Sequence, residues 1–198
     1  MPPQSQKRSL ILASSSPYRK MLLERLGVPF TVLSSAVDES RRPGEAPARM
    51  VQRLAETKAA IVAQDSPAAV VIGSDQVAVH AGQVVGKPGD AARARQQLTS
   101  FSGSEVEFLT AVSVQCLELG LHFAASVVTE VSFRDLTAAE IERYIARDNP
   151  LDCAGAFKSE AAGIALLQAM HSSDPTAIIG LPLISVAQAL REAGYNVP

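Results

Sequence analysis

The run AAVVIGSDQVAVH at residues 68–80 is the most hydrophobic strand-like stretch in the chain. It breaks at Gly73-Ser74-Asp75 and resumes at Val77. A nearly continuous apolar run is typical of a strand buried on both faces, and such strands belong to α/β proteins whose helices flank the sheet. The sequence therefore predicts a central strand that ends at Asp75 within an α/β fold.

Strand-like and helix-like segments alternate through the first half of the chain, whereas two adjacent strands begin the second half. Local signals mark the boundaries: Ser16 and Pro17 begin a helix, Gly27 ends it, and Thr137 with Glu140 forms a capping box. Besides the central run, the predicted strands are 9–13, 30–33, 106–117, 121–134 and 163–168, and the predicted helices are 17–26, 48–64, 90–103, 138–148 and 182–193.

Hairpins interrupt the alternation of strands and helices, so the predicted fold class is α/β with a mixed, twisted sheet and flanking helices. The 198 residues fit one domain or two tightly joined lobes. The change of character near residue 103 suits lobes of about 1–103 and 104–198 with a central cleft.

Composition excludes several classes of function. A hydrophobic fraction of 47% and a net charge of −2 are those of a globular protein with too little positive charge to favour a nucleic-acid polymer as partner. Cys116 and Cys153 have no metal-type spacing and are interpreted as buried thiols in a reducing compartment, with a disulfide as the alternative. The first ten residues lack the apolar core of a signal peptide, and no apolar run reaches membrane-spanning length. We expect a cytoplasmic protein without a membrane partner.

The segment LILASSSPYRK places hydroxyls and positive charge directly after a buried strand. A helix N-terminus leaves backbone N–H groups free and carries a partial positive charge. Together with the hydroxyls of Ser14 and Ser16 and the charge of Arg19, it would form a phosphate cradle. The alternative is an ordinary capped helix start, with Arg19 and Lys20 in solvent.

Two lysines are candidates for the same anion. Lys58 lies between Leu54 and Ile61 on the apolar stripe of its helix, so we expect it to point inward toward a negative partner, unless its charged end reaches the rim. Lys87 stands in GQVVGKP, which has the wrong spacing and the wrong final residue for a Walker motif.

The acidic candidates are Asp75, expected at the end of the central strand, and Glu39 in VDES. A carboxylate at the carboxyl end of an α/β strand can bind a divalent metal or accept a proton from water, although GSDQ could also be a simple turn. The three histidines show no spacing of a serine hydrolase, and no G-x-S-x-G occurs. The whole set suits hydrolysis of a polyphosphate with a metal ion.

Six segments, in order along almost the whole chain, resemble the Maf family of nucleotide pyrophosphatases, which is related in fold to the inosine-triphosphatase-like proteins. They are SSSPYRKMLLERLG, VDES, LAETKA, GSDQV, GKPG, and CAGAFKSE followed by GLPL. GSDQ and FKSE favour the 7-methyl-GTP pyrophosphatase branch over the branch that acts on dTTP and UTP.

The resemblance implies hydrolysis of a nucleoside triphosphate to the monophosphate and pyrophosphate, with a divalent cation such as Mg, Mn or Co. It implies these site residues: Ser14, Ser16 and Arg19 for phosphate; Asp75 as general base, with Glu39, Lys58 and Lys87; Asp75 and Glu39 for the metal; Tyr18, Gln76 and Glu160 for the choice of base. Its rival is a non-catalytic nucleotide-binding regulator of septum formation. A homodimer is a further implication.

The base-reading positions also have a physical rationale. Methylation at N7 makes guanine cationic, and the ring of Tyr18 can attract a cation by stacking, while Glu160 can accept from the guanine edge. Gln76 could read an edge without charge. Tyr18 replaces the tryptophan that close relatives tend to have, so its stacking surface is smaller.

Overall fold

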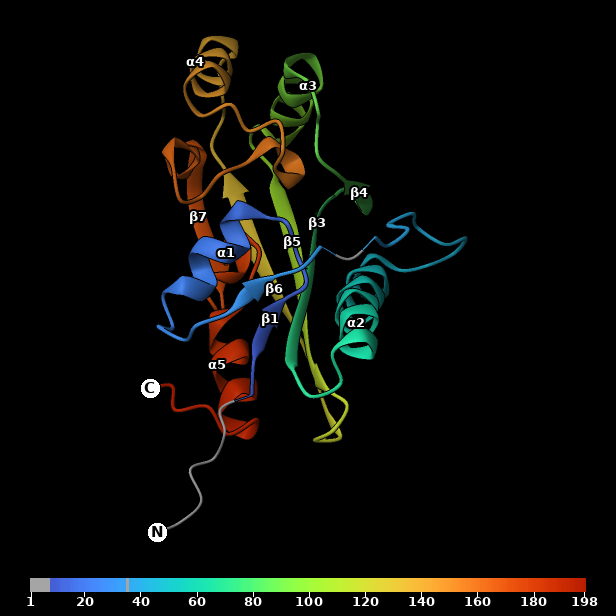
Figure 1. Ribbon diagram of the computed structural model, residues 1–198. Coiled ribbons are helices and arrows are strands. Elements are labelled where there is room, and N and C mark those ends of the chain that lie inside the picture. Colours follow the sequence, from blue (N-terminus) through green and yellow to red (C-terminus); the bar gives the residue numbers. More distant parts are fainter. Residues whose placement is uncertain (1–7, 35) are drawn as a thin grey trace.

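The computed structural model describes residues 8–34 and 36–198 and shows a mixed α/β fold (Figure 1). Its strands are β1 (Leu10–Leu12), β2 (Thr31–Val32), β3 (Val70–His80), β4 (Gln83–Val85), β5 (Glu105–Cys116), β6 (Leu121–Phe133) and β7 (Leu167–Ser172). Its α-helices are α1 (Pro17–Glu24), α2 (Pro47–Asp65), α3 (Ala91–Phe101), α4 (Ala138–Asp148) and α5 (Leu183–Glu192). The predicted α/β class is confirmed.

All seven strands join one sheet in the order β2-β1-β3-β5-β6-β7, with β4 paired to β3. The pairs of β1 with β2 and with β3 are parallel, whereas the pairs of β3 with β4, β3 with β5, β5 with β6 and β6 with β7 are antiparallel. The sheet is mixed because β5 and β6 form a long hairpin, as the sequence predicted. A division into lobes near residue 103 stays a prediction; the sheet itself continues across it, since β3 pairs with β5.

The helices cover the sheet in separate places and pack against clusters of buried side chains, some of which two helices share. In Figure 1, α2 lies on one side of the sheet, α1 and α5 on the other, and α3 with α4 at one end. Leu54 of α2 packs near β3 and β5, while Leu22 and Leu190 pack with the apolar residues of β1. Phe101 of α3 and Ile141 of α4 belong to a further cluster with residues at the ends of β5 and β6.

Local capping signals predicted several boundaries correctly. Ser16 caps α1, with Pro17 in its first turn, and Asp90 caps α3 by accepting from the backbone N–H of Arg93. The predicted capping box of Thr137 and Glu140 is present at the start of α4. These signals act within four residues, so tertiary contacts do not override them.

Three expectations were wrong. β3 runs unbroken through Gly73-Ser74-Asp75, so Asp75 lies inside the strand and does not end it. The strand expected at 163–168 is β7, four residues later, because residues 162–166 form a 3-10 turn. The side chain of Ile61 is exposed, which narrows the predicted apolar stripe of α2, although Lys58 does point inward.

Both cysteines are free thiols, Cys116 buried and Cys153 partly buried, so the disulfide alternative is excluded. None of the helices in the described part of the chain combines the length and apolar character needed to cross a bilayer. The expectation about a signal peptide concerns mainly residues 1–7, which lie outside the described residues.

Candidate active site

A cleft opens where β1 ends. β1 pairs with residues 70–72 of β3 and β4 pairs with residues 78–80, so in the described chain the stretch 73–77 between them has β5 as its only strand neighbour. This gap lies under a cleft of about 480 Å³, and Asp75, Gln76 and Val77 are part of its lining. The strand whose carboxyl end faces the site is therefore β1, which leads into the serine loop at residues 14–16.

The serine loop is tied to α1 and to a distant loop by hydrogen bonds. Ser14 Oγ accepts from the backbone N–H of Ser16 (3.2 Å) and from Arg19 Nη1 (3.2 Å). Ser16 Oγ accepts from the backbone N–H of Arg19, and Arg19 Nε donates to the carbonyl of Gly180 (2.9 Å). The serine loop can therefore be both a helix cap and a phosphate cradle, because the capping bond holds Arg19 where it lines the cleft.

Burial lowers the pKa of Arg19, while the Asp75 and Glu39 carboxylates oppose that effect. An arginine remains protonated in proteins under either influence. Arg19 therefore supplies a fixed positive charge to the wall of the cleft.

Lys58 joins the two predicted carboxylates. Its side chain is 8% exposed, and its Nζ lies 2.7 Å from Asp75 Oδ1 and 2.6 Å from Glu39 Oε1. The three charged groups therefore meet at one point on the cleft wall. The alternative that the charged end of Lys58 reaches the solvent-exposed rim is excluded, because Lys58 is buried and paired with both carboxylates.

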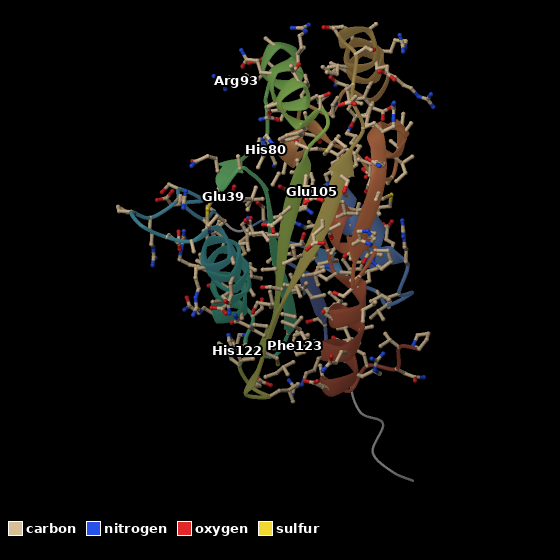
Figure 2. All side chains as sticks on the ribbon, turned by 180° about the vertical axis from the view of Figure 1, so that it is seen from behind. Glu39, His80, Arg93, Glu105, His122 and Phe123 are labelled. Atoms are coloured by element: carbon tan, nitrogen blue, oxygen red, sulfur yellow. The ribbon has the colours of Figure 1, made fainter. Side chains whose placement is uncertain are left out.

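Glu39 reaches this point from the loop before α2, near one end of that helix (Figure 2). Partial burial raises its pKa, but the hydrogen bond and charge of Lys58, with smaller contributions from Lys87 and Arg19, bring the pKa below its usual value. Glu39 is therefore an anion at neutral pH, and its side chain is 61% exposed.

A close approach of helix to strand makes the Lys58 contact possible. A Cβ at Gly73 would lie 2.3 Å from the carbonyl oxygen of Ala55 and 2.6 Å from the backbone nitrogen of Ala59. Only glycine leaves room for α2 at this distance. Because α2 lies so near β3, the side chain of Lys58 reaches Asp75, two residues beyond Gly73.

Backbone carbonyls of residues 177–180 accept hydrogen bonds from side chains of β3 and β5 beside the cleft. Gln76 Nε2 donates to the carbonyls of Ala177 (2.9 Å) and Ile178 (3.0 Å), and Ser74 Oγ donates to that of Gly180 (2.9 Å). Thr110 Oγ1 also donates to Ala177. The amide nitrogen of Gln76 is thus engaged in the fold, which leaves its Oε1 as the atom for ligand recognition.

A smaller extension of about 90 Å³ continues from the cleft past Tyr18 toward Glu160. The Tyr18 hydroxyl donates to the Asp152 carboxylate at 3.2 Å, and Lys158 Nζ lies 5.5 Å from the centre of the tyrosine ring. Burial, with the neighbouring Cys153 and Asp152, raises the Tyr18 pKa, so the phenol is protonated. Glu160 is exposed at the far end of the extension.

The structure brings all ten predicted site residues to this one cleft and its extension; nine line the cleft itself and Glu160 lines the extension. The histidines are elsewhere: His80 and His122 lie near opposite ends of the sheet (Figure 2), and none of the three lines either cavity. Sequence reasoning missed Asp152 and Lys158. They flank or belong to the CAGAFKSE segment, which was the signal that could have drawn attention to them.

Nearly the whole chain matches a known family. Residues 9–193 match the Maf-like protein family, so the chain belongs to the Maf family. Similar proteins include the 7-methyl-GTP pyrophosphatase of Xanthomonas axonopodis pv. citri, 53% identical over 96% of this chain and 98% of that protein. Proteins with the same name from Albidiferax ferrireducens and Pseudomonas syringae pv. tomato are 49% and 47% identical, over 96% of this chain and 96% and 99% of their own lengths.

Proposed function

We propose that this protein is a nucleoside triphosphate pyrophosphatase that hydrolyses 7-methyl-GTP, and other modified nucleoside triphosphates, to the monophosphate and pyrophosphate. The observation that carries the proposal is the meeting of Lys58, Asp75 and Glu39 opposite the serine loop and Arg19 in one cleft. Relatives of about 50% identity over nearly the whole chain carry the name of this activity, which supports the same substrate. Its role would be to keep modified nucleotides out of nucleic acid.

The cleft has the charge distribution that a triphosphate requires. Arg19, Lys58 and Lys87 line the cleft together with Ser14 and Ser16, whose hydroxyls can donate to an anion. Fixed cations and hydroxyl donors stabilise phosphate oxygens in the ground state and the transition state. We assign these five residues to the phosphates, with Lys58 also holding the two carboxylates.

The residues present fit a divalent cation. Within residues 8–34 and 36–198, no group of three or more His, Cys, Asp or Glu could hold a metal ion. Asp75 and Glu39 each bond to Lys58 through one oxygen and keep a second one, and a pair of carboxylates is what Mg²⁺ uses when substrate phosphates complete its shell. Asp75 and Glu39 would hold the ion, which when bound neutralises phosphate charge and activates water.

Asp75 is the proposed general base. Its Oδ1 accepts from Lys58, so we assign the proton of the attacking water to Oδ2. The water oxygen forms a bond to the α-phosphorus, the bond from that phosphorus to the bridging oxygen breaks, and the electron pair leaves with pyrophosphate.

The test is release of pyrophosphate from 7-methyl-GTP with Mg²⁺ by the wild type and by Asp75→Asn. The variant preserves shape, and loss of the base should lower kcat by about 100-fold or more while the Kd for nucleotide changes little. Asp65→Asn, an exposed residue at the end of α2, is the matched control. A near-normal kcat in Asp75→Asn would refute the mechanism, and a wild type that binds nucleotide without releasing pyrophosphate would favour the regulator.

For the base, we assign stacking to Tyr18, an acceptor role to Glu160 and edge contact to Gln76, which all line the extension.

The homodimer is also part of the proposal. Light scattering on the purified chain tests it directly, and a monomer mass at working concentration would remove it.

A further inference from the structure

The amino group of a lysine lies over one face of the proposed stacking residue, Tyr18. Lys158 Nζ lies over the Tyr18 ring at 5.5 Å from its centre. It donates to the carbonyls of Asp148 (2.9 Å) and Asn149 (3.3 Å) at the end of α4, and its side chain is 15% exposed. These bonds hold the ammonium in place, so a base can stack only on the other face of the ring.

This arrangement creates an electrostatic problem for a cationic base. A 7-methylguanine stacked on the free face would have the ammonium of Lys158 on the opposite side of the Tyr18 ring. Two like charges separated only by a ring repel each other in a partly desolvated site. Cys153 offers no compensation, because burial raises the pKa of its thiol to about 12 and leaves it neutral.

Asp152 lies where it can cancel that charge. One of its carboxylate oxygens is 3.8 Å from Lys158 Nζ, and both accept from the Tyr18 hydroxyl at 3.2 Å. Asp152 also lines both the cleft and its extension. A single carboxylate thus orients the tyrosine ring and balances the cation behind it.

We propose that Asp152 is a positioning residue for cationic purine recognition: it fixes the Tyr18 ring and neutralises Lys158, so that a positively charged base can stack on the free face. The inference rests on the proposed function, since it assumes that the base binds at Tyr18. It predicts that the preference for a methylated base depends on the charge balance of residues 152 and 158 more than on either residue alone.

The experiment compares Asp152→Asn, Lys158→Met and the double variant. Asparagine still accepts from Tyr18 but carries no charge, and methionine keeps the length of lysine without its charge. The readouts are the Kd values of 7-methyl-GMP and GMP, which need no hydrolysis, and kcat/KM for the two triphosphates. Glu118→Gln is the matched control, because it removes the same charge from an exposed ion pair with Arg8 outside both cavities.

Asp152→Asn should lower the preference for the methylated base by about 3- to 10-fold, with a smaller effect on GMP and GTP. Lys158→Met should raise that preference, and the double variant should return toward the wild type. Lys158→Gln, which keeps a donor for the α4 carbonyls, replaces Lys158→Met if the latter unfolds.

Equal loss for methylated and unmethylated nucleotides in Asp152→Asn, or no recovery in the double variant, would overturn the inference. Failure of the proposed function has a different signature, namely no pyrophosphate from 7-methyl-GTP with the wild type. The Kd ratios of the monophosphates still decide the role of Asp152 in that case, and a wild type without preference between them would overturn it as well.

Discussion

Substitution of Gly73 by alanine would test the contact between α2 and β3 on which the site depends. The new Cβ would lie 2.3 Å from the Ala55 carbonyl oxygen and 2.6 Å from the Ala59 nitrogen. Both neighbours are backbone atoms within a helix, so no side chain can rotate away. To restore an ordinary contact, α2 would have to move outward by about 1 Å.

Such overpacking destabilises a core by about 1–3 kcal/mol, and the rigid neighbours place Gly73→Ala in the upper part of that range. For a chain of this size, about 2–3 kcal/mol corresponds to a fall in Tm of roughly 4–12 °C. The same movement would lengthen the 2.7 Å contact between Lys58 and Asp75, so kcat for pyrophosphate release should fall too. Thermal unfolding and steady-state kinetics measure the two effects.

Gly86→Ala provides the control for stability, because a Cβ there meets no atom within 4 Å and its backbone angle is not in the left-handed region. An unchanged Tm for Gly73→Ala would refute the close approach. A lower Tm with unchanged kcat would show that the spacing of α2 from β3 does not control the Lys58 contact.

Three further predictions concern charge. Arg19→Ala should raise the KM for the triphosphate several-fold, and added salt should reproduce part of this rise in the wild type. A KM that changes with neither the substitution nor salt would show that Arg19 does not bind the phosphates. Glu160→Gln should lower kcat/KM for 7-methyl-GTP by about 10- to 100-fold and for GTP by less, since a charge-assisted hydrogen bond is lost. Equal losses for the two nucleotides would show that Glu160 does not recognise the base. The hydrogen bond from Arg53 lowers the pKa of Glu45 from 4.5 to about 2. The ion pair therefore contributes fully to stability above about pH 4.5, and this contribution disappears as the pH falls toward 2 and Glu45 is protonated. The difference in unfolding free energy between wild type and Glu45→Gln, measured against pH, should therefore shrink on acidification, and a difference that grows would contradict the assignment.

The parts of the fold that could be predicted from the sequence depend on short-range signals. Thr137 and Glu140 form their capping box from residues three apart, and the glycine at 120 turns the β5–β6 hairpin within the segment itself. The position of β7 could not be predicted this way. It is set by pairing with β6, with a register shift at Ser132 and Phe133 that no local pattern records.

The same distinction applies to the site. Gly73-Ser74-Asp75 looks like a turn in the sequence, yet each residue has a tertiary partner that keeps β3 extended: α2 at Gly73, the Gly180 carbonyl at Ser74 and Lys58 at Asp75. Lys58 could be predicted because a charge on an apolar stripe requires a partner. Asp152 could not, since its partners Tyr18 and Lys158 meet only in the folded chain.

The carbonyls of residues 177–180 hold Gln76, Ser74 and Arg19, and a carbonyl is present whatever the side chain. Except at Gly180, whose φ of 122° favours glycine, this segment should therefore tolerate changes of amino-acid identity wherever the core still accepts the side chain, while it should not tolerate a change of length. Inserting or deleting one residue would shift every acceptor out of register with its donor. Two homologous enzymes could thus differ at residues 177–179 and keep the same hydrogen bonds, provided that the number of residues stays constant and glycine remains at position 180.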